Sequence, residues 1–276
     1  MSEKVRKVTA QSYAKRVRLL GKLADIENPE KIKTVICAYP VSEARKGLLT
    51  NAYDYYCEFK GYQWIKPHFT REDKPIFLPL ESELDSLIAN TRDKMSTFLK
   101  FLKETGCDSG EAWKLRWLDI DLERKTVNIT PTKNHNARTL PISSNLLARL
   151  LELPRLNERV FASKNLDKMR WLLERARNQL ANKLENPRLR QISFKSFRHW
   201  KATMTYAKTK DILHVQHILG HKRLSNTLIY THLVNFESDE WSCKTAKTIE
   251  EAAVLIESGF DYVTEIDGFK LFRKRK

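Results

Sequence analysis

The sequence predicts a mainly α-helical protein with a small antiparallel β-sheet, an α+β arrangement in two domains. Three observations support this fold class. Long segments place apolar residues at helical spacing, one stretch alternates apolar and polar residues on either side of a polar turn, and a proline-containing stretch separates two helical parts. With 276 residues, 41% of them hydrophobic, the chain is long enough to build apolar cores in two domains.

The N-terminal residues 1–66 are predicted to form a helical domain. The segments TAQSYAKRVRLLGKLADI and SEARKGLLTNAYDYYCEFKGY have apolar residues at helical spacing, with basic residues between them. A DNA-gripping domain is the functional interpretation of these basic residues, and an ordinary helical bundle is the alternative. The candidate DNA contacts here are Lys15, Arg16 and Arg18.

A linker is predicted over residues 67–79, which carry Pro67, Pro75 and Pro79 and show no periodicity. The larger domain, residues 80–240, follows it.

A β-hairpin is the clearest strand signal in the larger domain. In ERKTVNITPTKNHNARTLPIS, Val127 and Ile129 alternate with polar residues on one arm, and Leu140 and Ile142 do so on the other. The polar residues KNHNA are expected to form the turn between the arms. Helical periodicity returns over residues 165–185 and 195–219.

Residues 241–276 are predicted to form a small C-terminal module. Their pattern indicates a strand, a helix, a strand, a tight turn at Asp267 and Gly268, and a last strand. The module ends in a basic run, residues 273–276, which is either a solvated tail or a further set of phosphate contacts.

The charge balance favours a polyanionic partner. Fifty Lys and Arg residues face 34 Asp and Glu residues, which gives a net charge of +16. We expect double-stranded DNA as the partner; a merely soluble basic protein is the alternative. No apolar run reaches the ~18 residues of a membrane span, so no membrane association is expected. The four cysteines form no CxxC motif, which favours reduced thiols and a cytoplasmic, nucleoid-associated protein.

The histidines of HVQHILGHKRLSNTLIYTHL raise the question of a metal site. His214 and His217 lie three residues apart on a predicted helix, 211–219, a spacing that zinc ligands also show. Gly220 is expected to end this helix, so His221 points elsewhere, and no acid or cysteine completes a set. We therefore expect neither a metal nor a cofactor.

Four segments, taken in order, resemble the catalytic domain of the tyrosine recombinases, the phage-integrase and Xer family. They are TGCDSGEAWKLRWLDID, the hairpin with Lys133 before its turn, KSFRHW and LGHKRLSNTLIYTHL. His221 stands 23 positions after Arg198 and nine before Tyr230, intervals like those of the family. The resemblance covers residues 77–236, and the C-terminal module is similar to extensions in archaeal integrase-like proteins.

This resemblance implies cleavage of DNA by a tyrosine, through a 3′-phosphotyrosine intermediate, with no metal and no ATP. Tyr230 would then be the nucleophile, Arg198 and His221 would bind phosphate oxygens, and Lys133 would protonate the leaving 5′-oxygen. Lys195 stands where the family has the histidine of HxxR. The family's assembly implies a tetramer on DNA, and the further candidate DNA contacts are Lys201, Lys222 and Arg223.

One position departs from the pattern in a way that matters chemically. Asp108 occupies the place of the family's first catalytic arginine, and its carboxylate would repel a phosphate. From the residues themselves, Asp108 with Glu111 three positions later reads as the N-cap and N3 acid of a helix. The candidate substitute cations are Lys114, Arg116 and Arg138.

The predicted function is site-specific recombination or integration of DNA. Two alternatives stay open: a DNA-binding member of the family with weakened or lost catalysis because of Asp108, and a topoisomerase IB-like enzyme that nicks and relaxes DNA.

Overall fold

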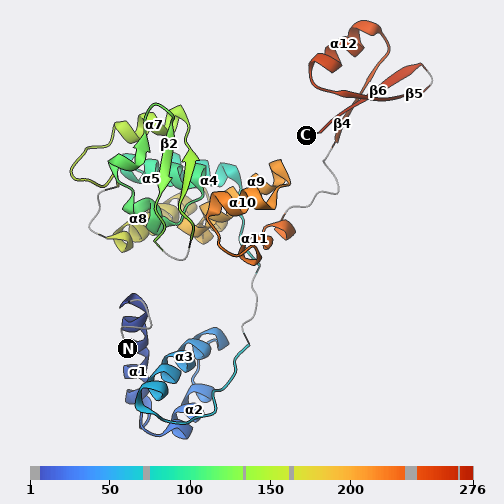
Figure 1. Cartoon of the computed structure of the whole chain (residues 1–276). Helices are drawn as coiled ribbons and strands as arrows, with labels where there is room; N and C mark the ends of the chain where they lie inside the picture. Colours follow the sequence, from blue (N-terminus) through green and yellow to red (C-terminus); the bar gives the residue numbers. More distant parts are fainter. Residues whose placement is uncertain are drawn as a thin grey trace. The chain divides into compact units, whose positions relative to one another are not determined.

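The computed structural model describes residues 7–70, 75–132, 135–161, 165–233, 241–266 and 268–275. The chain divides into two compact units, Met1–Pro75 and Ile76–Lys276 (Figure 1). The predicted fold class, mainly helical with small antiparallel sheets, is confirmed. In the described ranges, no helix has both the length and the apolar character needed to cross a bilayer.

The first unit is a three-helix assembly with its own apolar core. Asn28 caps its second helix by accepting from the backbone of Lys31, and Pro29 occupies the first helical position. Tyr53 is fully buried and donates its hydroxyl proton to the carbonyl of Ile26, so it belongs to the core. The helices are α1 (Lys7–Leu23), α2 (Pro29–Ala38) and α3 (Glu43–Lys60).

The second unit is built around one buried helix, α5 (Asp93–Thr105), which packs against α4, α7, α8 and α9. The ring of Phe98 on α5 lies 5.0 Å from that of Phe161 and 5.2 Å from that of Phe194, measured between centroids. These edge-to-face contacts pack α5 against Phe161 and against the first residue of α9, Phe194. The helices around α5 are α4 (Glu81–Ala89), α6 (Ser109–Lys114), η1 (Trp117–Asp119), α7 (Ser144–Leu151), α8 (Leu166–Lys183), η2 (Pro187–Gln191), α9 (Phe194–Thr209), α10 (Ile212–Leu219), α11 (Ser225–Leu228) and η3 (Thr231–Leu233).

The predicted hairpin is confirmed as part of a three-stranded antiparallel sheet in the order β1-β2-β3. Val127 pairs with Leu140, and both side chains are buried on the same face. Lys133 and Asn134, in the turn, lie outside the described residues. The strands are β1 (Ile120–Asp121), β2 (Thr126–Ile129) and β3 (Arg138–Pro141).

The helical periodicity predicted over 195–219 is divided between two helices, α9 and α10, and α10 corresponds to the helix predicted over 211–219. Lys210 adopts a left-handed conformation (φ 57°) and ends α9. Asp211 then caps α10 by accepting from the backbone of Leu213 and His214. A side chain that satisfies the exposed N–H groups of a new helix favours a break over continuation. Gly220 ends α10 in the left-handed region (φ 69°), as predicted.

The C-terminal module has the predicted order of elements: β4 (Trp241–Ala246), α12 (Ile249–Glu257), β5 (Asp261–Ile266) and β6 (Phe269–Arg275). Its strands form a second antiparallel sheet in the order β4-β6-β5. Ala246, Ala252, Phe260 and Phe272 form its core. Gly268 has a positive φ of 77° at the predicted turn, whereas Asp267 lies outside the described residues.

Candidate active site

A cavity of about 600 Å³ gathers most of the sequence-predicted catalytic residues. Tyr230, Arg198, His221 and Lys195 all line it, and so does Asp108. Their elements are far apart in sequence, because α6, α9 and the segment after α10 each contribute. The remaining lining residues are Cys107, Ser109, His135, Arg170, Leu173, Glu174, Arg177, Ser193, Phe194, His199, Asn226 and Ile229.

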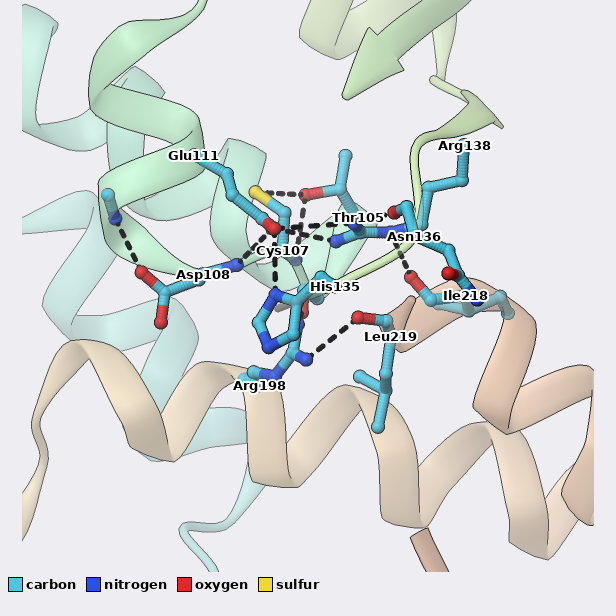
Figure 2. A network of polar contacts seen from close by, with 12 residues as sticks. Thr105, Cys107, Asp108, Glu111, His135, Asn136, Arg138, Arg198, Ile218 and Leu219 are labelled. Carbon is cyan, nitrogen blue, oxygen red and sulfur yellow. Dashed lines mark hydrogen bonds and ion pairs between the residues drawn. The ribbon is translucent and has the colours of Figure 1, made fainter. Parts of the chain in front are cut away.

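The Arg198 guanidinium is fixed by two backbone carbonyls. Nη1 donates to the Gly106 carbonyl at 2.8 Å. Nη2 donates to the Leu219 carbonyl, also at 2.8 Å (Figure 2). Burial lowers the pKa of Arg198, but an arginine side chain still keeps its charge in a protein. Its 7% exposure shows that the charge is held in place before any ligand arrives. Such a preorganised cation is suited to the negative charge that develops in phosphoryl transfer.

His221 follows Gly220 in the turn after α10. Its Nδ1 lies 2.9 Å from the Thr227 hydroxyl, which is fully buried. Burial and the charge of Arg198 lower the pKa of His221 to about 4, so the ring is neutral at pH 7. A neutral ring that accepts from Thr227 at Nδ1 carries its proton on Nε2, where it can donate to a ligand.

Tyr230 lies at the cavity wall with its hydroxyl already bonded. Its side chain is 2% exposed, and Oη lies 3.1 Å from Nδ1 of His199. Burial raises the pKa of Tyr230, and the charge of Arg198 opposes that rise. Burial, with Lys195 and Arg198 nearby, lowers the pKa of His199 to about 4, so the ring is neutral and its Nδ1 can accept a hydrogen bond from the phenol hydroxyl. Sequence reasoning missed this partnership, and its signal was the histidine next to Arg198 in KSFRHW.

The other predicted contact residues lie in several places. Lys195 is exposed in the first turn of α9, at the cavity. Lys201 lines a different hollow, with His214 and His217, and its burial lowers its pKa. Lys133 lies outside the described residues. Lys222 and Arg223 are exposed after His221, and on α1 Lys15 and Arg18 are exposed while Arg16 is half-buried.

The capping role predicted for Asp108 is confirmed. Its Oδ1 accepts from the backbone N–H of Gly110 at 2.8 Å, and its own N–H donates to Glu111 Oε2 at 2.9 Å. Asp108 therefore opens α6 with a reciprocal cap. Its carboxylate stays at the cavity wall, where the family pattern predicts a cation.

The three candidate substitute cations do not reach the cavity. Arg138 is fully buried, with Nη2 2.8 Å from Glu111 Oε2 and Nε donating to the Ile218 carbonyl at 2.7 Å. Arg116 pairs with Asp119, and Lys114 is exposed at the end of α6. Of the described residues that line the cavity, none is one of these three. The local sequence could not show where Arg138 points, because its partners lie 27 and 80 positions away.

His135, which sequence reasoning did not single out, lies at the cavity. Its Nδ1 is 2.8 Å from Glu111 Oε1, and its ring centroid is 5.9 Å from that of His221.

In the ranges that the structure describes, no three His, Cys, Asp or Glu side chains gather as a metal would require.

Comparisons with known proteins place most of the second unit in one family. Residues 80–236 match the model of the phage integrase family. A probable integrase/recombinase protein of Methanocaldococcus jannaschii is 32% identical over 155 residues, and the tyrosine recombinase XerA of Saccharolobus solfataricus is 28% identical over 147. Each match covers 52% of this chain and 47% of the relative, so the chain spans about half the length of these relatives.

A solved structure shows the same fold across most of the chain. The lambda integrase dimer bound to a COC′ core site has a TM-score of 0.65 with this chain at 15% identity, covering 87% of this chain and 93% of that one. Because the family match spans more than half of the residues, this chain belongs to the phage integrase family, the tyrosine recombinases.

Proposed function

We propose that this protein is a site-specific DNA recombinase that cuts and rejoins DNA through a 3′-phosphotyrosine intermediate. The observation that carries the proposal is the meeting of Tyr230, Arg198 and His221 in one cavity. The net charge of +16 supports a DNA partner, as does the DNA-bound state of the lambda integrase. The first unit, with Lys15, Arg16 and Arg18 on α1, would grip the duplex.

The chemistry needs no outside energy source. The Tyr230 oxygen attacks the phosphorus, a new O–P bond forms, and the bond from phosphorus to the 5′-oxygen breaks. The phenol proton passes to a base, for which Nδ1 of His199 is placed 3.1 Å from Oη, and the 5′-oxygen takes a proton from Lys133, the proposed general acid. Arg198 and His221 donate to the non-bridging oxygens. Attack of a free 5′-hydroxyl on the phosphotyrosine reverses these steps and joins the strands.

Since Tyr230 lines the cavity of its own chain, the geometry supports cleavage in cis. Strand exchange needs two duplexes and therefore several protomers, so we propose a tetramer on DNA. The dimeric state of the DNA-bound lambda integrase supports self-association.

A nicked suicide duplex tests the proposal directly. Loss of the short fragment that carries the new 5′-hydroxyl traps the covalent intermediate, which is detected as a protein–DNA band on a denaturing gel. We expect the band with the wild-type chain and its loss with Tyr230→Phe. A band that persists in Tyr230→Phe, or no band at all, contradicts the proposal, and supercoil relaxation without strand exchange favours a topoisomerase IB-like activity.

The acid at position 108 favours a second candidate, a DNA-binding family member with weakened catalysis. Loss of one preorganised donor costs ~10²–10³ in rate. Under this candidate, Asp108→Arg raises adduct formation by orders of magnitude. An unchanged rate would mean that another cation already serves the phosphate.

A further inference from the structure

The cavity contains a histidine, His135, to which the proposed mechanism gives no role. Resting on the proposed function, we propose that His135 binds a non-bridging oxygen of the scissile phosphate and supplies the positive charge that Asp108 does not. In this role His135 is a catalytic residue of this chain, held in place by Glu111.

The backbone fixes His135 at the site. It forms an antiparallel bridge with His221, and the N–H of Asn136 donates to the Gly220 carbonyl at 2.8 Å. The approach is close enough that a Cβ on residue 220 would lie 2.9 Å from the Asn136 carbonyl oxygen. The pairing thus places the residue after the hairpin turn opposite the phosphate-binding histidine.

Glu111 sets the orientation and charge of the ring. Its carboxylate is fully buried, accepts from Asp108 N–H and Arg138, and lies 2.8 Å from Nδ1 of His135 (Figure 2). Hydrogen bonds from Arg138 and His135 lower the pKa of Glu111, so the carboxylate is ionised. In the proposed role the ring donates from both nitrogens, from Nδ1 to this carboxylate and from Nε2 to the phosphate oxygen.

The other basic side chains of the cavity fit this task less well. Arg177 on α8 donates to the Ile192 carbonyl, and Arg170 is 57% exposed and pairs with Asp167. His135 is only 18% exposed, and its ring lies beside that of His221. His135 is therefore held beside a proposed phosphate ligand by a buried network.

In the proposed step His135 keeps its protons. Nε2–H donates to a non-bridging oxygen as the oxygen of Tyr230 bonds to phosphorus and the 5′-oxygen leaves with a proton from Lys133. The histidine stabilises added negative charge, as an arginine at position 108 would.

The test uses the full chain on the suicide duplex, with His135→Gln as the main variant. Glutamine keeps an N–H donor for Glu111 but has no charge, so we expect adduct formation to fall by roughly 10²-fold, with melting temperature and DNA binding unchanged. The double variant Asp108→Arg/His135→Gln restores the rate to within about tenfold of wild type. His217→Gln, an exposed histidine outside the cavity, is the matched control and leaves the rate unchanged.

A second substrate separates charge from structure. A methylphosphonate at the scissile position lacks one charged oxygen, so in one diastereomer the deficit of His135→Gln should shrink to about threefold. A deficit of equal size on both substrates, or no restoration by Asp108→Arg, overturns the role.

Failure of this role and failure of the proposed function give different results. A wild-type chain that forms the Tyr230-dependent adduct, together with a folded His135→Gln within twofold of it, overturns the role of His135 alone. A wild-type chain with no adduct overturns both.

Discussion

Helices α4 and α6 begin in nearly the same way, yet their first turns do different work. In each, a glutamate at the third helical position accepts from the backbone N–H of the residue before the helix: Leu80 to Glu83 at 2.8 Å, and Asp108 to Glu111 at 2.9 Å. Both glutamates are buried, and each pairs with an arginine from a distant segment.

The difference lies in what surrounds the two arginines. Arg188, the partner of Glu83, is 50% exposed, whereas Arg138, the partner of Glu111, is fully buried and also bonds the Ile218 carbonyl. Each glutamate also has a further partner: Asn186 donates to Glu83 at 3.3 Å, and His135 lies 2.8 Å from Glu111 at the cavity. The same local cap is thus a simple helix start in α4, and in α6 it joins the hairpin, the end of α10 and the cavity.

Replacing each of the two arginines should give the largest difference in stability between the two helix starts. Arg138→Met leaves a buried charge without its main partner, so we expect a loss of ~3–5 kcal/mol in the free energy of unfolding. Arg188→Met removes a half-exposed pair and should cost ~1 kcal/mol or less. Urea denaturation of both variants measures the two losses, and equal losses would show that burial of the arginine does not decide the strength of the pair.

Lowering the pH should reduce the stability of the fold around the cavity, because two buried histidines there take up protons on unfolding. His199 and His221 have folded pKa values of about 4 against the usual 6.5, so the unfolded chain takes up protons first as pH falls. Stability is therefore complete above pH 6.5 and is lost as the pH falls to about 4, by ~3 kcal/mol per histidine at ~1.4 kcal/mol per pKa unit.

The check is a series of thermal or urea unfolding curves between these pH values. His199→Gln should flatten the loss, because it removes one of the two histidines with a lowered pKa. The two glutamates act at lower pH: their folded pKa values are lowered, so their contribution is complete above the unfolded value and fades as pH falls through the folded one. A wild-type curve that stays flat down to pH 4 would contradict the buried neutral state of the histidines.

Local features of the site could be predicted from sequence. The cap at Asp108 and Glu111, the Val127–Leu140 hairpin and the helix stop at Gly220 all depend on residues close together in the chain. The meeting of Tyr230, Arg198 and His221 followed from a family resemblance, not from any local rule.

Distant pairings could not be predicted in the same way. Arg138 has the positive charge expected of a substitute cation, but its side chain is buried against Glu111 and does not line the cavity. His135 gave no signal by itself, because its role depends on a backbone bridge to His221. The positions of these two side chains depend on tertiary packing, which cannot be inferred from a single sequence.

Removing each glutamate's charge should sharpen the contrast in activity. Under the proposed function, Glu111→Gln loosens His135 and should slow formation of the phosphotyrosine adduct ~10-fold, ~1.4 kcal/mol in the barrier. Glu83→Gln, in a matched cap away from the cavity, should leave the rate within twofold. The suicide-duplex assay at constant temperature compares them, and similar rates in the two variants would mean that Glu111 acts only on folding.

The smallest effect concerns the residue before each helix, and here stability and activity should separate. Leu80 is 59% exposed and makes no side-chain cap, so Leu80→Ser should add ~0.5–1 kcal/mol to the free energy of unfolding without changing cleavage. Asp108→Ala removes a cap that is in use and should cost ~1 kcal/mol. The same change removes a carboxylate from the phosphate site, so the adduct rate should rise while stability falls. Parallel urea curves and adduct assays decide this, and a fall in both quantities would mean that the start of α6 matters to catalysis more than the charge does.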